Sequence, residues 1–302
     1  MEGPTKLVGF ALGMVAASLG GAALGTAVGP VASDAETEHS GMHTDTAARA
    51  EVASELPGGL MVSQRGYTLA LAQPTLLAGD EAPIRLRILG PDGTPVADYT
   101  ESHGKDLHLV AIRRDMTGYQ HVHPRLDTRG TWRVPLDLSE PGEYRVFADF
   151  TPAGHDQSLT LGADLSVAGT YSPRPLPAPS TTAQVDGYTV ALDGALIPGE
   201  ESELTLSVRK DGRPVTDLQP YLEAYGHLVA LRDGDLAYLH VHPAGSPGDG
   251  STAPGPEVTF YATAPSGGDY RLFLDFRHDG VVRTAEFTVA ATGDSGKSGH
   301  DH

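Results

Sequence analysis

The sequence predicts an all-β protein in which two tandem immunoglobulin-like β-sandwich domains follow an N-terminal transmembrane or signal helix. Three observations predict this class. The chain repeats itself over a unit of about 105 residues, each unit is divided into short apolar runs separated by turn signals, and an uncharged apolar segment stands near the N-terminus. Two domains also suit the length of 302 residues.

The apolar segment runs from Leu7 to Val28, and Lys6 precedes it. About 20 apolar residues span a bilayer, and a positively charged flank tends to stay in the cytoplasm. Two outcomes stay open at this point. The segment is a single-pass anchor that leaves the later domains outside the cell membrane, or it is a cleaved signal peptide and the protein is secreted.

The two copies can be aligned by eye. The segment "GYTLALAQPTLLAGDEAPIRLRI" from Gly66 matches "GYTVALDGALIPGEESELTLSV" from Gly187, and "PGEYRVFADF" matches "GGDYRLFLDF". The proline-rich "GTYSPRPLPAPSTTAQ" between them is typical of an extended linker, so we expect the copies to fold independently. The expected organisation is an anchor or signal peptide at 1–30, a flexible linker at 31–60, sandwich domains at 61–169 and 186–291, a linker at 170–185 and a disordered histidine-containing tail at 292–302.

Each copy carries about seven short runs rich in Val, Leu, Ile, Tyr and Phe, among them "YTLAL", "LHLVAI" and "YRVFADF". The turn signals "GD", "PDG" and "EPGE" divide these runs. This pattern is typical of an immunoglobulin-like sandwich. Tyr144 and Tyr270 each open a run after a turn, as the corner tyrosine of that fold does.

Three histidines stand in the second-copy stretch "HLVALRDGDLAYLHVHP", residues 227–243. Asp-Gly favours a two-residue hairpin turn, which would place His227 opposite His240. Since side chains alternate along a strand, His242 would share the face of His240. Three imidazoles on one face predict a site for a divalent metal ion.

The first copy has the same three histidine positions in "HLVAIRRDMTGYQHVHP", residues 108–124. A four-residue loop at 115–118 would leave His108, His121 and His123 on one face, whereas a bulged three-residue loop would turn His108 away. Further candidate ligands are His103 and His155 in this copy and Glu223, four residues before His227, in the second copy. Asp149 and Asp275 are candidates to orient a ligand histidine, although pairing with Arg145 and Arg271 or exposure to solvent is the preferred interpretation.

Composition excludes several functions. The chain has 39 acidic and 21 basic residues, a net charge of −18 and no cysteine. Such charge repels nucleic acid, and without cysteine neither a disulfide nor a type 1 copper centre is available. Sequence motifs of the common hydrolases and P-loop enzymes are missing, so we expect a protein that is not an enzyme.

An anchored, cysteine-free chain with "HVHP" and "YR[VL]FxDF" motifs resembles the secreted copper-tolerance modules of bacteria, the CopC and YtkA-like proteins, and two-domain envelope proteins of high-GC bacteria. The resemblance implies metal tolerance or delivery outside the cytoplasm, with Cu(II) as the expected ion, Zn(II) as the alternative, and a membrane metal transporter or chaperone as partner. The competing hypothesis is a non-enzymatic adhesion or scaffold protein whose histidines are structural.

Overall fold

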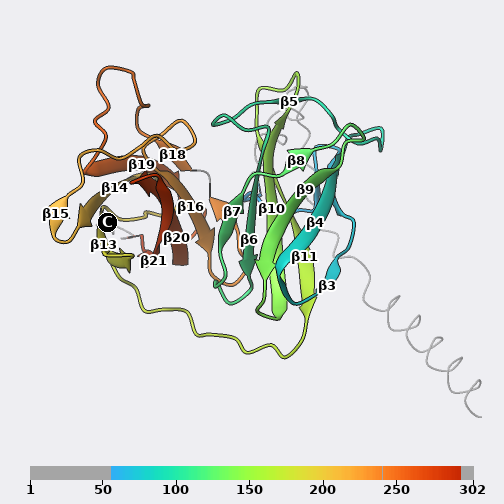
Figure 1. The fold of residues 1–302 in the computed structure, drawn as a ribbon, viewed down its shortest axis with the longest axis horizontal. Helices are drawn as coiled ribbons and strands as arrows, with labels where there is room; N and C mark the ends of the chain where they lie inside the picture. Colours follow the sequence, from blue (N-terminus) through green and yellow to red (C-terminus); the bar gives the residue numbers. More distant parts are fainter. Residues whose placement is uncertain (1–55, 240, 294–302) are drawn as a thin grey trace, which may run out of the picture. The chain divides into compact units, whose positions relative to one another are not determined.

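The computed structural model describes residues 56–239 and 241–293. They form two tandem β-sandwiches, as predicted, and no helix occurs among them (Figure 1). Within these residues no helix is long and apolar enough to cross a membrane. The apolar segment at 7–28 and the residue His240 lie outside the described residues.

The first sandwich consists of two sheets with the strand orders β1-β2-β4-β9-β8 and β3-β11-β10-β6-β7, and β5 also pairs with β10. The strands are β1 (Ser63–Gln64), β2 (Tyr67–Leu71), β3 (Thr75–Leu77), β4 (Gly79–Leu89), β5 (Tyr99–Thr100), β6 (Leu107–Arg113), β7 (Gln120–Val122), β8 (Arg125–Leu126), β9 (Trp132–Leu138), β10 (Gly142–Pro152) and β11 (Leu159–Ala168). Strands β2-β4-β9-β8 face β11-β10-β6-β7, which is the two-sheet arrangement of immunoglobulin domains.

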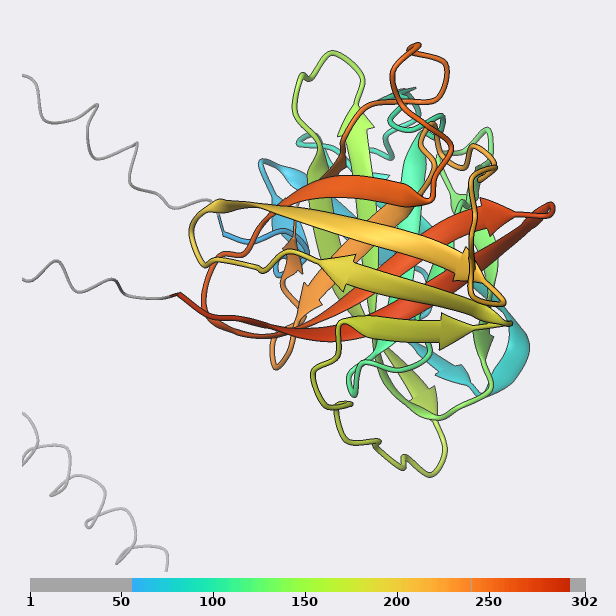
Figure 2. The same ribbon diagram turned by 90° about the vertical axis from the view of Figure 1, so that its left-hand side faces the viewer.

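The second sandwich repeats this plan, with the orders β12-β13-β14-β19-β18 and β17-β16-β20-β21, and with β15 beside β14. The strands are β12 (Thr182–Val185), β13 (Tyr188–Asp193), β14 (Glu201–Lys210), β15 (Arg213–Pro214), β16 (His227–Arg232), β17 (Tyr238–Leu239), β18 (Val241–Pro243), β19 (Glu257–Thr263), β20 (Gly268–His278) and β21 (Val281–Ala291). Figure 2 shows the yellow and orange strands of the first of these sheets side by side.

The predicted corner tyrosines are confirmed. The Tyr144 hydroxyl donates to the Glu140 carbonyl oxygen at 2.8 Å, and the Tyr270 hydroxyl donates to the Ser266 carbonyl oxygen at 2.8 Å. Both tyrosines are buried, so each bond ties the start of a central strand to the preceding turn.

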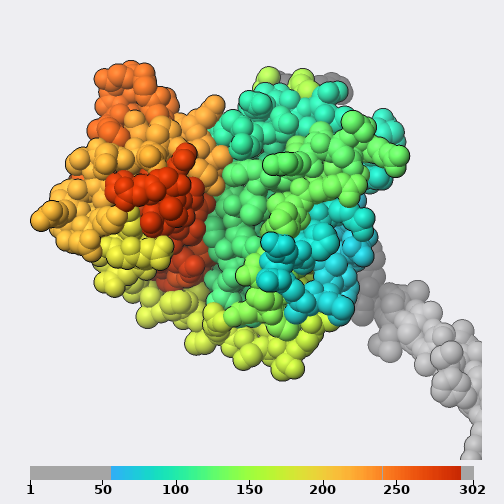
Figure 3. Space-filling view, in the orientation of Figure 1, coloured from blue at the N-terminus to red at the C-terminus, as the bar shows by residue number. Residues whose placement is uncertain are grey.

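Each sandwich has its own apolar core, and a third cluster lies between them. Val110, Ile112 and Phe147 of the first copy pack in one cluster with Val229 and Phe273 of the second. In the space-filling view, the green surface of the first copy lies directly against the surface of the second (Figure 3). The proline-rich linker predicts copies that are isolated from each other. Instead, apolar side chains on the outer faces of β6, β10, β16 and β20 bury one another, because both faces of these strands are apolar.

The contact between the sandwiches has an approximate twofold character. Tyr119 stacks on Phe273 with ring centroids 4.0 Å apart, and the equivalent Tyr238 packs on Phe147 at 5.5 Å. Each tyrosine lies in one copy and its phenylalanine in the other. The repeated sequence therefore uses the same aromatic pair twice, once in each direction across the contact.

The two hairpins that carry the histidines differ from the predicted turns. In the second copy Ala230 pairs with Leu239, so the loop is longer than an Asp-Gly turn by two residues. Leu236 accounts for the difference, since it is 1% exposed in the cluster between the sandwiches and has a φ of 61°. The strand then crosses to the other sheet, where His242 pairs with Tyr261, and the predicted pairing of His227 with His240 is absent from the register.

In the first copy Val110 pairs with His121, which is two residues away from the predicted register. Met116, 1% exposed, takes the same buried position as Leu236 in the other copy. A shift of two residues keeps every side chain on its face, because side chains alternate with a period of two. His108, His121 and His123 therefore share one face, as predicted, and this face is turned toward the second sandwich.

Candidate metal centre between the two sandwiches

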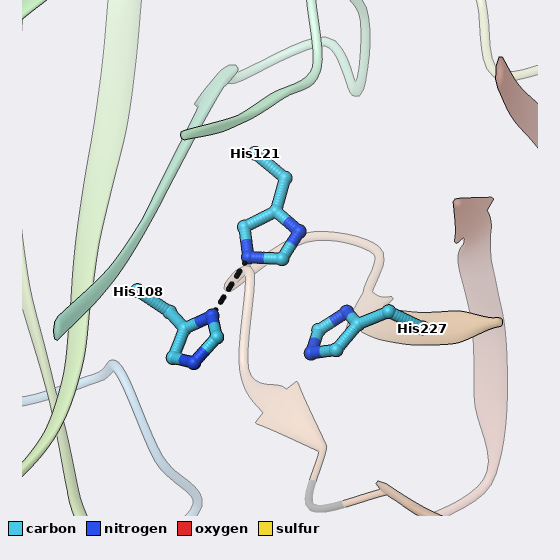
Figure 4. A group of neighbouring side chains, drawn as sticks. All are labelled: His108, His121 and His227. Atoms are coloured by element: carbon cyan, nitrogen blue, oxygen red, sulfur yellow. Dashed lines mark hydrogen bonds between the residues drawn. The ribbon is translucent and has the colours of Figure 1, made fainter. Parts of the chain in front are cut away.

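Three buried histidines from different copies meet between the sandwiches. The ring nitrogens of His108, His121 and His227 that face one another all lie within 4.8 Å (Figure 4). His108 is on β6, His121 on β7 and His227 on β16. The structure thus forms one composite group from both copies, where the sequence predicted a separate group in each copy.

His123 completes the first-copy set. Its Nε2 lies 3.3 Å from His108 Nδ1, and its ring centroid lies 4.9 Å from that of His121. His123 is partly exposed, whereas the side chain of His121 is 1% exposed. His123 is therefore the solvent-side member of the group.

The second-copy histidines are placed differently. His227 is in the group, His242 is exposed on β18 and belongs to the other sheet, and His240 lies outside the described residues. Among the other candidates, His155 is exposed and bonds the Tyr67 hydroxyl at 2.9 Å. His155 is not part of the group of clustered histidines in the described structure.

Two oxygen atoms fix the orientation of the inner rings. His121 Nδ1 lies 2.9 Å from Asp275 Oδ2, and His108 Nε2 lies 2.9 Å from the Ser102 carbonyl oxygen. A carbonyl and a carboxylate only accept hydrogen bonds, so both of these ring nitrogens carry the proton. The remaining nitrogens, His108 Nδ1 and His121 Nε2, face each other at 3.1 Å.

Asp275 neither pairs with Arg271 nor faces solvent, so the preferred interpretation of this residue is wrong. It is 2% exposed, bonds His121 of the other copy, and accepts from the Thr284 hydroxyl at 2.6 Å. Arg271 pairs with Glu286 instead. The equivalent Asp149 accepts from the Thr160 hydroxyl at 3.2 Å, and Arg145 pairs with Asp164. Sequence reasoning missed Ser102 entirely, since a backbone carbonyl leaves no signal in residue type.

Protonation of three histidines of the group is disfavoured. Burial, together with the neighbouring His121, lowers the pKa of His108 to about 4 and that of His123 to about 3. Burial also lowers the pKa of His227 well below its ordinary value, and the imidazoles of His121 and His108 add to this. His108, His123 and His227 are therefore neutral imidazoles with a lone pair available at neutral pH.

The two copies also match a known family. Residues 62–167 and 183–293 each match the family described as a domain of unknown function, DUF8832. The chain belongs to this family. Each DUF8832 domain is thus one sandwich, and the histidine group lies between the two DUF8832 domains. No curated protein matches the chain.

Solved structures that match the chain include the Escherichia coli adhesin FdeC, with 16% identity over 76% of this chain and 65% of that chain and a TM-score of 0.26. The Yersinia pseudotuberculosis adhesin InvE has 16% identity over 75% and 59%, with a TM-score of 0.24. A putative membrane-anchored protein from Corynebacterium diphtheriae has 9% identity over 76% and 59%, with a TM-score of 0.23. The DUF8832 chain spans 65% or less of each of these chains.

Proposed function

We propose that this protein binds one divalent metal ion between its two sandwiches, Cu(II) in preference to Zn(II), outside the cytoplasmic membrane, for metal tolerance or delivery. The proposed ligands are His108 Nδ1, His121 Nε2, His123 Nε2 and one ring nitrogen of His227. Asp275 and Ser102 orient two of these rings, which is the usual arrangement around a histidine-bound metal.

One observation carries the proposal. His108 Nδ1 and His121 Nε2 are 3.1 Å apart although the other nitrogen of each ring already donates to an oxygen. Two neutral imidazoles in these tautomers would direct lone pairs at each other, which is repulsive. A cation between them removes the repulsion, and protonation of His108 is disfavoured by its burial.

The spacing of the nitrogens fits an ion. Metal–nitrogen bonds of about 2.0–2.1 Å place two ligand nitrogens about 3.3 Å apart around a tetrahedral ion. The distances of 3.1 Å and 3.3 Å from His108 Nδ1 to the nitrogens of His121 and His123 match that separation. His227 Nδ1 is buried and has no hydrogen-bond partner among the described residues, so an unsatisfied polar atom is present at the same place.

The donor set decides the class of metal. Imidazole suits Cu(II), Zn(II) and Ni(II), and the intrinsic order of affinity favours Cu(II) over Zn(II). The chain contains no cysteine, so the soft thiolate ligand that Cu(I) favours is missing from every site. The resemblance to CopC and YtkA-like modules supports copper through the same histidine motifs.

A second candidate function is the adhesion or scaffold role. The buried bond between His121 and Asp275 favours it, because a protonated His121 would donate to Asp275 and to His108 Nδ1 and join the sandwiches without an ion. Here the histidines would be structural. The two candidate functions differ at His121 Nε2. In the first this nitrogen binds a metal ion, and in the second it carries a proton and donates it to His108 Nδ1.

Titration of the metal-free, full-length protein with Cu(II) and Zn(II), followed by bound-metal analysis and thermal unfolding, separates these candidates. We expect one tightly held ion per chain, lost in His121→Ala and retained in His155→Ala. The His121→Ala protein keeps His39, His43, His300 and His302, which lie outside the two domains. Weak metal binding by these residues is therefore the same in the variant and in the parent protein. Equal uptake by His121→Ala and the parent protein would support the scaffold role and overturn the metal proposal.

The location is tested separately. Lys6 before the apolar segment predicts that the domains lie outside the cytoplasmic membrane. Protease added to intact cells with permeabilised outer layers should digest both sandwiches. Complete protection of both would contradict the proposed location without affecting the metal site.

A further inference from the structure

Two equivalent turns lie over the histidine group. In the first copy Ser102 and Lys105 exchange backbone hydrogen bonds of 2.9 Å and 3.1 Å, and in the second copy Tyr221 and Ala224 do the same at 2.8 Å and 3.2 Å. The two central residues of each turn have positive φ angles. The first turn precedes β6, which carries His108, and the second precedes β16, which carries His227. Each copy therefore places one turn beside the histidine group.

The turns bring further ligand-type side chains close to the buried histidines. The ring centroid of His103 lies 6.1 Å from that of His108 and 6.0 Å from that of His227. A Cβ atom placed on Gly104 would lie 3.7 Å from Glu223 Oε1, so Glu223 of the second copy reaches the turn of the first. His103 and His227 also line the same small pocket.

The two turns are not chemically equivalent. Leu222 stands where the first copy has His103, and it is buried. His103 is partly exposed and Glu223 is exposed. The carboxylate of Glu223 and the imidazole of His242, both from the second copy, act electrostatically on His103. A nitrogen and an oxygen ligand therefore stand on the solvent side of the buried group.

We propose that His103 and Glu223 form an outer station that captures a divalent ion and passes it to and from the four clustered histidines, His108, His121, His123 and His227. This inference rests on the proposed function. A hydrated ion that enters a buried site in one step loses its water before it gains its ligands, which is costly. An imidazole and a carboxylate at the rim replace part of the hydration shell first, and the buried imidazoles then displace them one at a time. No bond other than metal–ligand bonds forms or breaks.

This role predicts an effect on rates and not on affinity. His103→Asn is the informative variant, because asparagine tolerates the positive φ of 51° at this position while it removes the imidazole. We expect Cu(II) capture by the full-length protein, and its removal by a chelator, each to slow by about tenfold. The equilibrium dissociation constant should stay unchanged, because both rates fall together.

Stopped-flow measurement of the two rates, with an equilibrium competition titration, tests the proposal. Glu223→Gln should slow both rates to a smaller extent, and His155→Ala and Glu257→Gln serve as matched controls at exposed positions. Parent rates in His103→Asn would overturn the outer station. A weaker affinity caused by faster release alone would also overturn it, since His103 would then be a ligand of the buried site. Failure of the parent protein to bind Cu(II) would overturn the proposed function itself.

Discussion

His121 of the first sandwich lies with its Nδ1 2.9 Å from the Asp275 carboxylate of the second, and both side chains are almost fully buried. The bond links the two copies at the point where their histidines meet. It makes Asp275 part of the proposed site although its own strand carries none of the ligands.

Replacing Asp275 with asparagine should weaken Cu(II) binding about 10–100-fold, as loss of an oriented carboxylate behind a ligand histidine does elsewhere. Asparagine keeps the volume of the side chain but removes its charge. Competition titration against a chelator measures the change. Asp149→Asn is the matched control at the equivalent position, where the carboxylate bonds Thr160, and it should stay within about threefold of the parent. Equal losses in both variants would show that the effect is not specific to Asp275.

The stoichiometry should be one ion per chain, because one group is assembled from both copies. His227→Ala should therefore abolish uptake even though it leaves His108, His121 and His123 of the first copy intact. A saturating ion at about 100 times its dissociation constant should stabilise the parent by about 2.7 kcal/mol. Elemental analysis and thermal unfolding measure both quantities. Two ions per chain, or half of the uptake left in His227→Ala, would favour a separate site in each copy.

The metal-free fold should lose stability as the pH falls from about 6.5 to about 4. In this window the unfolded histidines bind protons, whereas folded His108, with its pKa lowered to about 4, and His123, at about 3, do not. The unfolded state then binds more protons than the folded state, so the free energy of unfolding decreases as the pH is lowered. Asp149 acts in the opposite direction, since burial raises its pKa to about 6.

Chemical denaturation at pH 7.5 and at pH 5 measures this dependence. His108→Gln should reduce the difference between the two pH values, because glutamine does not titrate. Stability that is equal at both pH values in the parent protein would contradict the burial of neutral imidazoles. Metal affinity should instead decline only near and below about pH 4, where folded His108 begins to bind a proton, because a ligating imidazole must be unprotonated.

The contact between the sandwiches should contribute strongly to stability. Phe273 is fully buried against Tyr119 of the other copy, so Phe273→Ala should cost about 3–5 kcal/mol. Val282→Ala, at a residue 40% exposed, should change stability by less than about 0.5 kcal/mol. Denaturant unfolding measures both values. A small loss in Phe273→Ala would show that the sandwiches do not depend on each other.

The sequence by itself determined the sandwiches, the corner tyrosines and the shared face of His108, His121 and His123. These features follow from local rules. Alternation along a strand fixes the face of each side chain. The predicted face was therefore correct although the predicted register of the hairpin was wrong by two residues. Turn residues before Tyr144 and Tyr270 likewise act within a few positions.

Only the tertiary structure decided that histidines from both copies form a single group. In the second copy the buried loop residue Leu236 lengthens the hairpin, because burial in the shared cluster outweighs the preference of Asp-Gly for a short turn. In the first copy Met116 is buried in the same cluster, and the register is shifted by two residues. The runs "LVAI" and "LVAL", apolar on both faces, carried the one signal that these sheets were to be covered by another layer. This pattern indicates that another surface covers these sheets, but it does not indicate which surface, because the hydrophobic effect is not directional. The meeting of His108 and His121 with His227 therefore depended on the packing of one sandwich on the other.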